Sequence, residues 1–227
     1  MSANYTAALR YQAAWLDVPP ERLEGEGFVN ITAIRGEKVP GYAKPVRLHA
    51  LRMEGRQEIY AACVPGMKRR PRPKHPDSLF FWFGALNPSI DTSQAQALDK
   101  NDLPAFLNFF KAAYPKNNHL AWLPAYFHRI TAQRRCFGVF ENERLVCVAD
   151  APTIPYLPEM IVEPGIMTLP GFRRKGYAAA ACAAFIEEQL RRGLAPIWTC
   201  AIDNDASAGL AQYLGYKPFG VLWRLCE

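Results

Sequence analysis

The sequence TLPGFRRKGYA, residues 168–178, joins an extended segment to an alanine-rich helix through a basic, glycine-bearing turn. Backbone amides in such a turn and in the first helical turn have no partner inside the helix, and the helix dipole adds partial positive charge there. Gly176 lets a ligand approach the backbone closely, and Ala178 adds little bulk. The stretch predicts an anion cradle suited to a diphosphate. An ordinary strand-to-helix connection with solvated cations is the alternative.

The flanking segments strengthen the prediction of a binding site. Residues 159–168 are rich in β-preferring side chains but contain Pro164 and Gly165. Because a central strand disfavours proline, we expect a bulge or a local opening of the sheet at this point. Residues 176–192 are expected to form a helix that stops at Gly193. The later expected elements are a strand (197–202), a helix capped by residues 203–207 and ending near 216, and a final strand (219–225).

Two motifs together resemble the Gcn5-related N-acetyltransferase (GNAT) superfamily. Arg173-x-x-Gly176-x-Ala178 corresponds to the acyl-CoA pyrophosphate motif of that superfamily. The second motif is Asn204-x-x-Ser207-x-x-Leu210-x-x-x-Leu214-Gly215-Tyr216, which corresponds to its segment ending in L-G-F/Y. The resemblance is to bacterial members with an N-terminal extension. It implies an α+β fold (a three-layer α/β arrangement) whose mixed, mostly antiparallel sheet is splayed at the cofactor site.

The resemblance also suggests a division into two domains. Residues 89–227 would form the acetyltransferase domain, with helices near 101–110 and 121–132 and a hairpin that turns at 141–144. Residues 1–88 would form an N-terminal α+β region whose role the sequence does not identify. A degenerate half of the same fold, in tandem with the first, is an alternative for this region. Its expected elements are an amphipathic helix (5–16) stopped by Pro19 and Pro20, and strands at 46–51, 59–64 and 80–83.

Acetyl-CoA is the acyl donor that the resemblance implies. Its pantetheine arm would lie beside the strand that contains Ile166, Met167 and Thr168, with Ile166 and Thr168 as main-chain partners. Asn204 and Ser207 would contact the pantetheine or the phosphate end, unless they only cap the following helix. The residues expected around the diphosphate are Arg173, Arg174, Lys175, Gly176, Tyr177 and Ala178.

Catalysis would require a base for the amine and a proton for the leaving thiolate. Glu163 is the candidate base and Glu159 the reserve, the alternative being that Glu163 is a surface residue at a strand end. Ala211 stands where tyrosine-using members of the superfamily carry their general acid, and Tyr213 and Tyr216 are out of phase with that position. The predicted function is acyl-CoA-dependent N-acyltransfer, most simply of acetyl, to an amine on a small molecule or protein. A catalytically silent acyl-CoA-binding or regulatory protein is the alternative.

The composition limits other functions. The net charge of +6 arises partly from the run at residues 68–76, which contains no interleaved aromatic side chains. We therefore favour a solvated loop over a nucleic-acid contact; a contact with the ribose 3′-phosphate of coenzyme A is a third interpretation. The Phe80–Phe83 run is expected to be a buried strand, with an acceptor pocket as the alternative.

Location, metal binding and assembly are predicted as follows. The six cysteines form no C-x-x-C pair and the four histidines (49, 75, 119 and 128) have no ligand spacing, so we expect reduced core thiols and no metal site. The chain contains no apolar run long enough to span a bilayer and no signal-like start, which favours the cytoplasm over a membrane. The sequence is compatible with a homo-oligomer but does not predict one.

Overall fold

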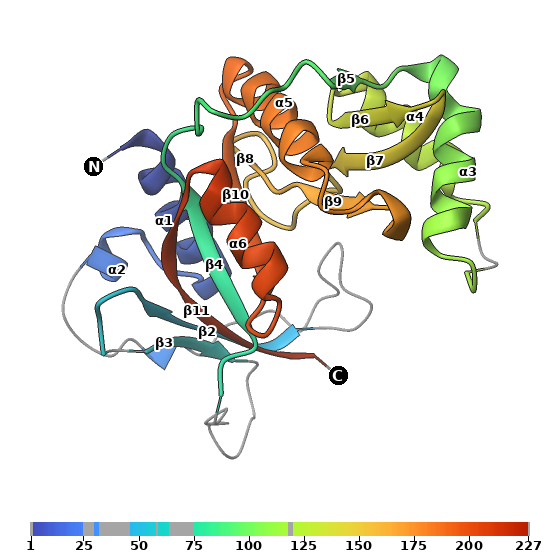
Figure 1. The fold of residues 1–227 in the computed structure, drawn as a ribbon. Coiled ribbons are helices and arrows are strands. Elements are labelled where there is room, and N and C mark those ends of the chain that lie inside the picture. Colours follow the sequence, from blue (N-terminus) through green and yellow to red (C-terminus); the bar gives the residue numbers. More distant parts are fainter. Residues whose placement is uncertain are drawn as a thin grey trace. The chain divides into compact units, whose positions relative to one another are not determined.

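The computed structural model describes residues 2–24, 30–31, 46–57, 59–63, 75–117 and 120–226, and Figure 1 shows their arrangement as a ribbon. The chain divides into two compact units. Unit 1 comprises residues 1–85, 153–162 and 195–227, and unit 2 comprises residues 86–152 and 163–194. Most of the predicted basic run, at 68–74, and His119 lie outside the described residues.

Unit 1 contains one seven-stranded sheet with the strand order β1-β3-β2-β11-β4-β10-β8. Only the pairs β1–β3 and β10–β8 are parallel, so the sheet is mixed and mostly antiparallel, as predicted. Its elements are α1 (Ala3–Leu16), α2 (Glu21–Glu24), β1 (Asn30–Ile31), β2 (Val46–Met53), β3 (Tyr60–Cys63), β4 (Ser78–Phe83), β8 (Ile161–Val162), β10 (Ala195–Ala201), α6 (Asp205–Leu214) and β11 (Tyr216–Cys226).

Strand β4 is central to this sheet although it comes from the N-terminal part of the chain. It pairs antiparallel with β10, where Trp82 lies opposite Ile197, and antiparallel with β11, where Phe83 lies opposite Tyr216 (Figure 1). Phe80 and Phe81 are buried. The apolar run is therefore a core strand, as expected, and the two regions predicted from the sequence share one sheet. The division at residue 88 stays a prediction about domains.

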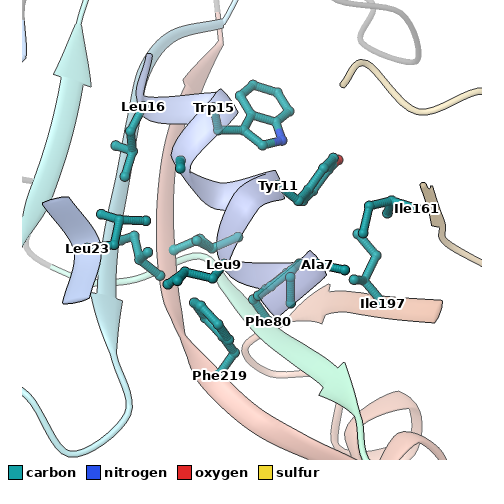
Figure 2. Close-up of a cluster of buried hydrophobic side chains, with 14 of the residues drawn as sticks. Ala7, Leu9, Tyr11, Trp15, Leu16, Leu23, Phe80, Ile161, Ile197 and Phe219 are labelled. Carbon is teal, nitrogen blue, oxygen red and sulfur yellow. The ribbon is translucent and has the colours of Figure 1, made fainter. Parts of the chain in front are cut away.

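The core of unit 1 forms where α1 packs against the sheet. Figure 2 shows Leu9, Tyr11 and Leu16 of α1 among Phe80 of β4 and Phe219 of β11. The rings of Phe80 and Phe219 meet edge to face with centroids 5.4 Å apart, a geometry that aromatic pairs favour. The apolar residues of the first helix are thus explained by burial against the sheet, where α1 contacts β10, β4, β2 and β3.

Unit 2 contains a four-stranded sheet with the order β5-β6-β7-β9, antiparallel throughout. Phe106 and Phe127, one from each of the helices α3 and α4, are buried with ring centroids 4.6 Å apart. The elements of unit 2 are β5 (Ala95–Ala97), the 3₁₀ turn η1 (Lys100–Asp102), α3 (Leu103–Ala113), α4 (Leu123–Ala132), β6 (Cys136–Glu141), β7 (Arg144–Asp150), β9 (Gly165–Thr168), the 3₁₀ turn η2 (Pro170–Phe172) and α5 (Tyr177–Arg191).

The strand expected over residues 159–168 is divided between the two sheets. β8 pairs parallel with β10, through Ile161 opposite Ala195, whereas β9 pairs antiparallel with β7, through Thr168 opposite Cys147. Residues 163–164 lie between the two strands and belong to neither, and residues 158–160 form a turn. The proline thus interrupts the ladder, as expected, and the chain changes sheets at the interruption.

The end of α1 and the turn before α3 both involve an aspartate, and α1 ends at the predicted residue. α1 ends at Leu16 because Asp17 adopts a left-handed conformation with φ of 56°, so the helix stops before Pro19 and Pro20. Ahead of α3, Asp99 caps the 3₁₀ turn η1, because its side chain accepts a hydrogen bond from the Asn101 amide at 2.7 Å.

Candidate functional site

Strand β9 forms one edge of the four-stranded sheet, and within unit 2 it pairs only with β7. The Leu169 amide donates to the Val146 carbonyl at 3.0 Å, which places the backbone of Leu169 on the β7 side. Backbone groups alternate along an antiparallel strand, so Met167 also faces β7, and Ile166 and Thr168 face the open edge. An extended ligand can pair with Ile166 and Thr168 in the manner of an added strand.

The side chain of Arg173 supports this assignment of the edge. Its Nε donates to the Thr168 carbonyl oxygen at 3.2 Å, so that oxygen points away from β7. Arg173 and the neighbouring Arg174 are both exposed. Two guanidinium groups therefore stand in the turn that continues from the open strand edge.

Helix α5 begins with amides that no side chain caps. Gly176 precedes the helix with φ of 83°, and the helical hydrogen bonds start with the Ala180 amide donating to the Gly176 carbonyl at 3.0 Å. The amides of Tyr177, Ala178 and Ala179 precede that bond and have no acceptor inside the helix. A Cβ atom added at Gly176 would meet nothing within 4 Å, so the space beside the turn is open. This geometry fits an anion.

Glu141, at the end of β6, ties the turn to the sheet. Lys175 Nζ donates to Glu141 Oε1 at 2.9 Å, and the Tyr177 hydroxyl donates to Glu141 Oε2 at 2.5 Å. The hydrogen bonds from Tyr177 and Lys175 lower the pKa of the Glu141 carboxyl, and the bond to Glu141 raises the pKa of Lys175. Lys175, predicted as a diphosphate ligand, thus has a carboxylate partner, whereas Arg173 and Arg174 have none among the described residues.

The candidate base Glu163 lies in the short connection before β9. It is half-buried and precedes the first residue of the open edge strand by two positions. The reserve candidate, Glu159, is exposed in the turn at residues 158–160. The role of either residue stays a prediction.

The remaining predicted donor contacts belong to unit 1. Asn204 caps α6, because its Oδ1 accepts a hydrogen bond from the Ser207 amide at 3.1 Å. The Ser207 hydroxyl accepts a hydrogen bond from Trp198 Nε1 at 3.1 Å. Helix capping, one of the two interpretations of Asn204, is therefore present, and contact of either residue with the donor stays a prediction. Ala211 is fully buried on the same helix.

Sequence reasoning missed a carboxyl group in unit 2, that of Asp150. Asp150 is the last residue of β7, is half-buried, and accepts a hydrogen bond at Oδ2 from the Tyr126 hydroxyl at 2.6 Å. Burial raises the pKa of Asp150 to about 6, against the opposing effect of the Tyr126 hydrogen bond. In the sequence Asp150 only ends an apolar run, which is the pattern of a solvated strand end, and no local signal distinguished it; Gly165 is its neighbour only through the pairing of β7 with β9.

The histidines that could be placed have structural or exposed positions. His49 is fully buried, stacks on Trp15 and places Nε2 2.9 Å from Gln12 Oε1. Burial lowers its pKa well below the usual range. His128 is exposed on α4. Within the described residues there is no cluster of three or more metal-ligating side chains, and no helix there is long and apolar enough to cross a bilayer.

Comparison with known families bears on the segment that contains this geometry. Residues 124–220, from α4 through the hairpin, the cradle and α6, match the family described as GNAT acetyltransferase. This segment belongs to the GNAT acetyltransferase family. The resemblance inferred from the two motifs is thereby confirmed. No curated protein sequence matches the chain.

Two solved structures of GNAT-family proteins share the fold. An acetyltransferase of the family from Colwellia psychrerythraea superposes with a TM-score of 0.54 at 16% identity, over 67% of this chain and 57% of the other. A GNAT-family structure from Novosphingobium aromaticivorans gives a TM-score of 0.52 at 19% identity, over 82% of this chain and 70% of the other. The chain thus spans little more than half the length of the Colwellia protein. At these identities the similarity confirms the predicted α+β fold.

Proposed function

We propose that this chain is an acyl-CoA-dependent N-acyltransferase that transfers acetyl from acetyl-CoA to an amine. The observation that supports this most directly is the start of α5, whose first amides have no side-chain cap and lie beside open space at Gly176. The turn before α5 continues from the edge strand β9, in which the backbone groups of Ile166 and Thr168 point outward. Membership of residues 124–220 in the GNAT acetyltransferase family supports the same reaction class.

The donor would lie along β9 and end at the start of α5. The outward amides and carbonyls of Ile166 and Thr168 would pair with the amides of the pantetheine arm. The amides of Gly176, Tyr177 and Ala178 would bind the diphosphate, and the helix dipole would add to that attraction. Asn204 and Ser207 are proposed as further donor contacts. Arg173, Arg174 and Lys175 supply positive charge in the turn.

The reaction requires a neutral amine to attack the thioester carbonyl. A carbon–nitrogen bond forms, the carbon–sulfur bond breaks, and the thiolate leaves with the electron pair of that bond. We assign the proton released by the amine to Glu163, directly or through water. Because Ala211 offers no acidic group, water is the proposed proton donor to the thiolate, whose conjugate thiol has a pKa near ~8.5.

Ala178→Glu tests the cradle. Glutamate at the second helical position suits the helix dipole, so the fold is retained, whereas its charge repels a diphosphate bound at the same amides. We expect calorimetry to show acetyl-CoA binding weakened at least about tenfold, the equivalent of ~1.4 kcal/mol. The matched control is Ala184→Glu, which makes the same change further along α5. If both variants bind acetyl-CoA equally well, the start of α5 does not bind the diphosphate, and that part of the proposal is wrong.

A second experiment separates the enzyme from a silent acyl-CoA-binding protein. Release of free coenzyme A thiol from acetyl-CoA is measured across a panel of amines. The proposal predicts amine-dependent release, slowed in Glu163→Gln at unchanged donor affinity. Donor binding without release for every amine would favour the silent protein. Unaltered release in Glu163→Gln would exclude Glu163 as the base.

A further inference from the structure

The carboxyl group of Asp150 has no cationic partner among the residues that the structure describes. Its one side-chain hydrogen bond comes from the Tyr126 hydroxyl, at 2.6 Å. The nearby guanidinium of Arg129 lies over the Tyr126 ring, 5.4 Å from its centroid. A carboxylate in these surroundings lacks the positive charge that usually compensates burial.

The carboxyl group can be approached across β9, because a glycine lies opposite it. Gly165 pairs with Asp150 in the β7–β9 register. A Cβ atom added at Gly165 would lie 3.0 Å from Asp150 Oδ1, so any other side chain there would press on that oxygen. Both residues are partly exposed. The absence of a side chain at this one position leaves Oδ1 reachable at the start of the open edge strand.

Aromatic rings connect the surface of unit 2 with this carboxyl group. Trp122 is 48% exposed and lies edge to face with Tyr126 at 5.4 Å between centroids. Tyr114 is 41% exposed, and its ring lies 4.7 Å from that of Phe110, which in turn lies 5.7 Å from Trp122. A shallow hollow of about 560 Å³ adjoins Tyr114, lined by residues 113–117. Ring faces attract ammonium groups, most strongly when water is excluded.

Four ionisable groups around Asp150 are uncharged at neutral pH; the nearby charges are those of Arg129, which acts on Tyr126, and Asp102, which acts on Cys136. Tyr126 from α4 and Tyr114 from the end of α3 have pKa values raised by burial and by the Asp150 charge. Cys136 from β6 and Cys182 from α5 also have pKa values raised by burial, so both remain thiols. Asp150 has a pKa of about 6 and is therefore ionised at pH 7.

We propose that Asp150, with the rings of Tyr114, Trp122 and Tyr126, binds an ammonium group of the acceptor substrate. The acceptors would then be small molecules that arrive as cations, with the ammonium at Asp150 and an apolar or cyclic portion on the exposed rings. This inference rests on the proposed function and names its substrate class. It assigns Asp150 to recognition, whereas the proton transfer stays with Glu163.

The test measures binding of benzylammonium chloride to the full-length chain by calorimetry, without acetyl-CoA. Benzyl alcohol and benzoate serve as the neutral and anionic comparisons. We expect binding of the ammonium alone, weakened about tenfold or more in Asp150→Asn, a substitution that keeps an acceptor for Tyr126. Because the ammonium requires the ionised carboxylate, affinity should rise between about pH 5 and about pH 7.5. Glu187→Gln, which alters an exposed carboxylate on α5, should bind like the unmodified chain.

Three outcomes overturn the proposal: unchanged affinity in Asp150→Asn, equal binding of benzyl alcohol, or affinity that does not vary with pH. Gly165→Ala should also weaken the binding of benzylammonium. An unchanged affinity in this variant would show that the ligand does not reach Asp150 across β9. The binding assay contains no acyl donor, so it is independent of turnover. If turnover is found, Asp150→Asn should raise KM for cationic amines with kcat retained; a fall in kcat at constant KM would assign Asp150 to proton transfer and contradict a recognition role.

Discussion

At the scale of the single residue, Asp150 links the proposed site to stability. An Asp carboxyl with an ordinary pKa of 3.8 is held in the folded chain at about 6 by burial. The folded state then binds more protons than the unfolded state between these two values. The contribution of Asp150 to stability is therefore expected to fall as the pH rises from about 4 to about 6 and to be constant above that range, with a total loss of about 3 kcal/mol from this group.

Asp150→Asn is expected to stabilise the chain at neutral pH. Asparagine removes the buried charge and keeps an oxygen for the Tyr126 hydroxyl. The free energy of unfolding in urea should exceed that of the unmodified chain by about 1–3 kcal/mol at pH 8, with the difference shrinking toward pH 4. A variant less stable than the unmodified chain at pH 8, or a difference independent of pH, would contradict the raised pKa. Sites that gain stability when a charge is removed are commonly functional.

At this scale, the sequence correctly predicted the features that depend only on residues close together in the chain. Gly176 was singled out for its backbone freedom, and it adopts φ of 83° at the start of α5. Asp150 was missed because its surroundings come from α3, α4, β6 and α5, which are distant in sequence. A pKa depends on spatial neighbours, and those are not visible in a linear pattern.

At the scale of the element, the β6–β7 hairpin positions the turn that precedes α5. The hairpin reverses through Asn142 and Glu143, both with positive φ. It places Glu141 against Lys175 and Tyr177. Because these bonds hold the turn before any ligand is present, less ordering is needed when an anion binds.

Glu141→Gln is expected to weaken acetyl-CoA binding severalfold while changing stability little. Glutamine lacks the negative charge that holds both Lys175 and Tyr177, so the turn becomes less ordered. Stability changes little, because the lost ion pair is largely exposed and contributes little to folding. Calorimetry with acetyl-CoA and thermal unfolding test the two parts. Glu143→Gln, an exposed change in the same hairpin, is the matched control. An affinity equal to that of the control would show that the turn needs no such support.

The elements themselves were predicted well where periodicity and composition agree. The hairpin, α5 and the Phe80–Phe83 strand followed from apolar runs and turn residues. The prediction of one strand over residues 159–168 was wrong in one respect. The segment forms two short strands, β8 and β9, which lie in different sheets. Proline marks where a ladder breaks, but which partner each half then finds depends on the rest of the fold.

At the scale of the whole molecule, β4 makes the sheet of unit 1 depend on the N-terminal part of the chain. β4 lies between β10 and β11, and α1 supplies Leu9, Tyr11 and Leu16 to the same core (Figure 2). Without residues 1–85, β10 and β11 would lose their shared partner and expose both edges and the apolar face.

A chain that begins at residue 86 is therefore expected not to form unit 1. Trp198 and Trp223, which are 2% and 5% exposed, report on that unit. With Trp122 replaced by Phe in every sample, and Trp15 and Trp82 replaced by Phe wherever residues 1–85 are present, acrylamide should quench the fluorescence of the shortened chain severalfold more than that of the full chain. Adding residues 1–85 as a separate chain should restore protection. Protection of both tryptophans in the shortened chain alone would show that β4 is dispensable.

The sequence alone predicted the glycine-bearing turn at the start of α5, the family resemblance and most helices and strands, because each depends on residues close together in the chain, through capping, periodicity and backbone freedom. That the turn binds an anion stays a proposal. Only the tertiary structure decided that β4 enters the sheet between β10 and β11, that the chain changes sheets between β8 and β9, and that Asp150 is a partly buried carboxyl with no cationic partner in the part of the chain that the structure describes. The physical reason is that strand order and burial are set by competition among distant partners for the same backbone and apolar surface.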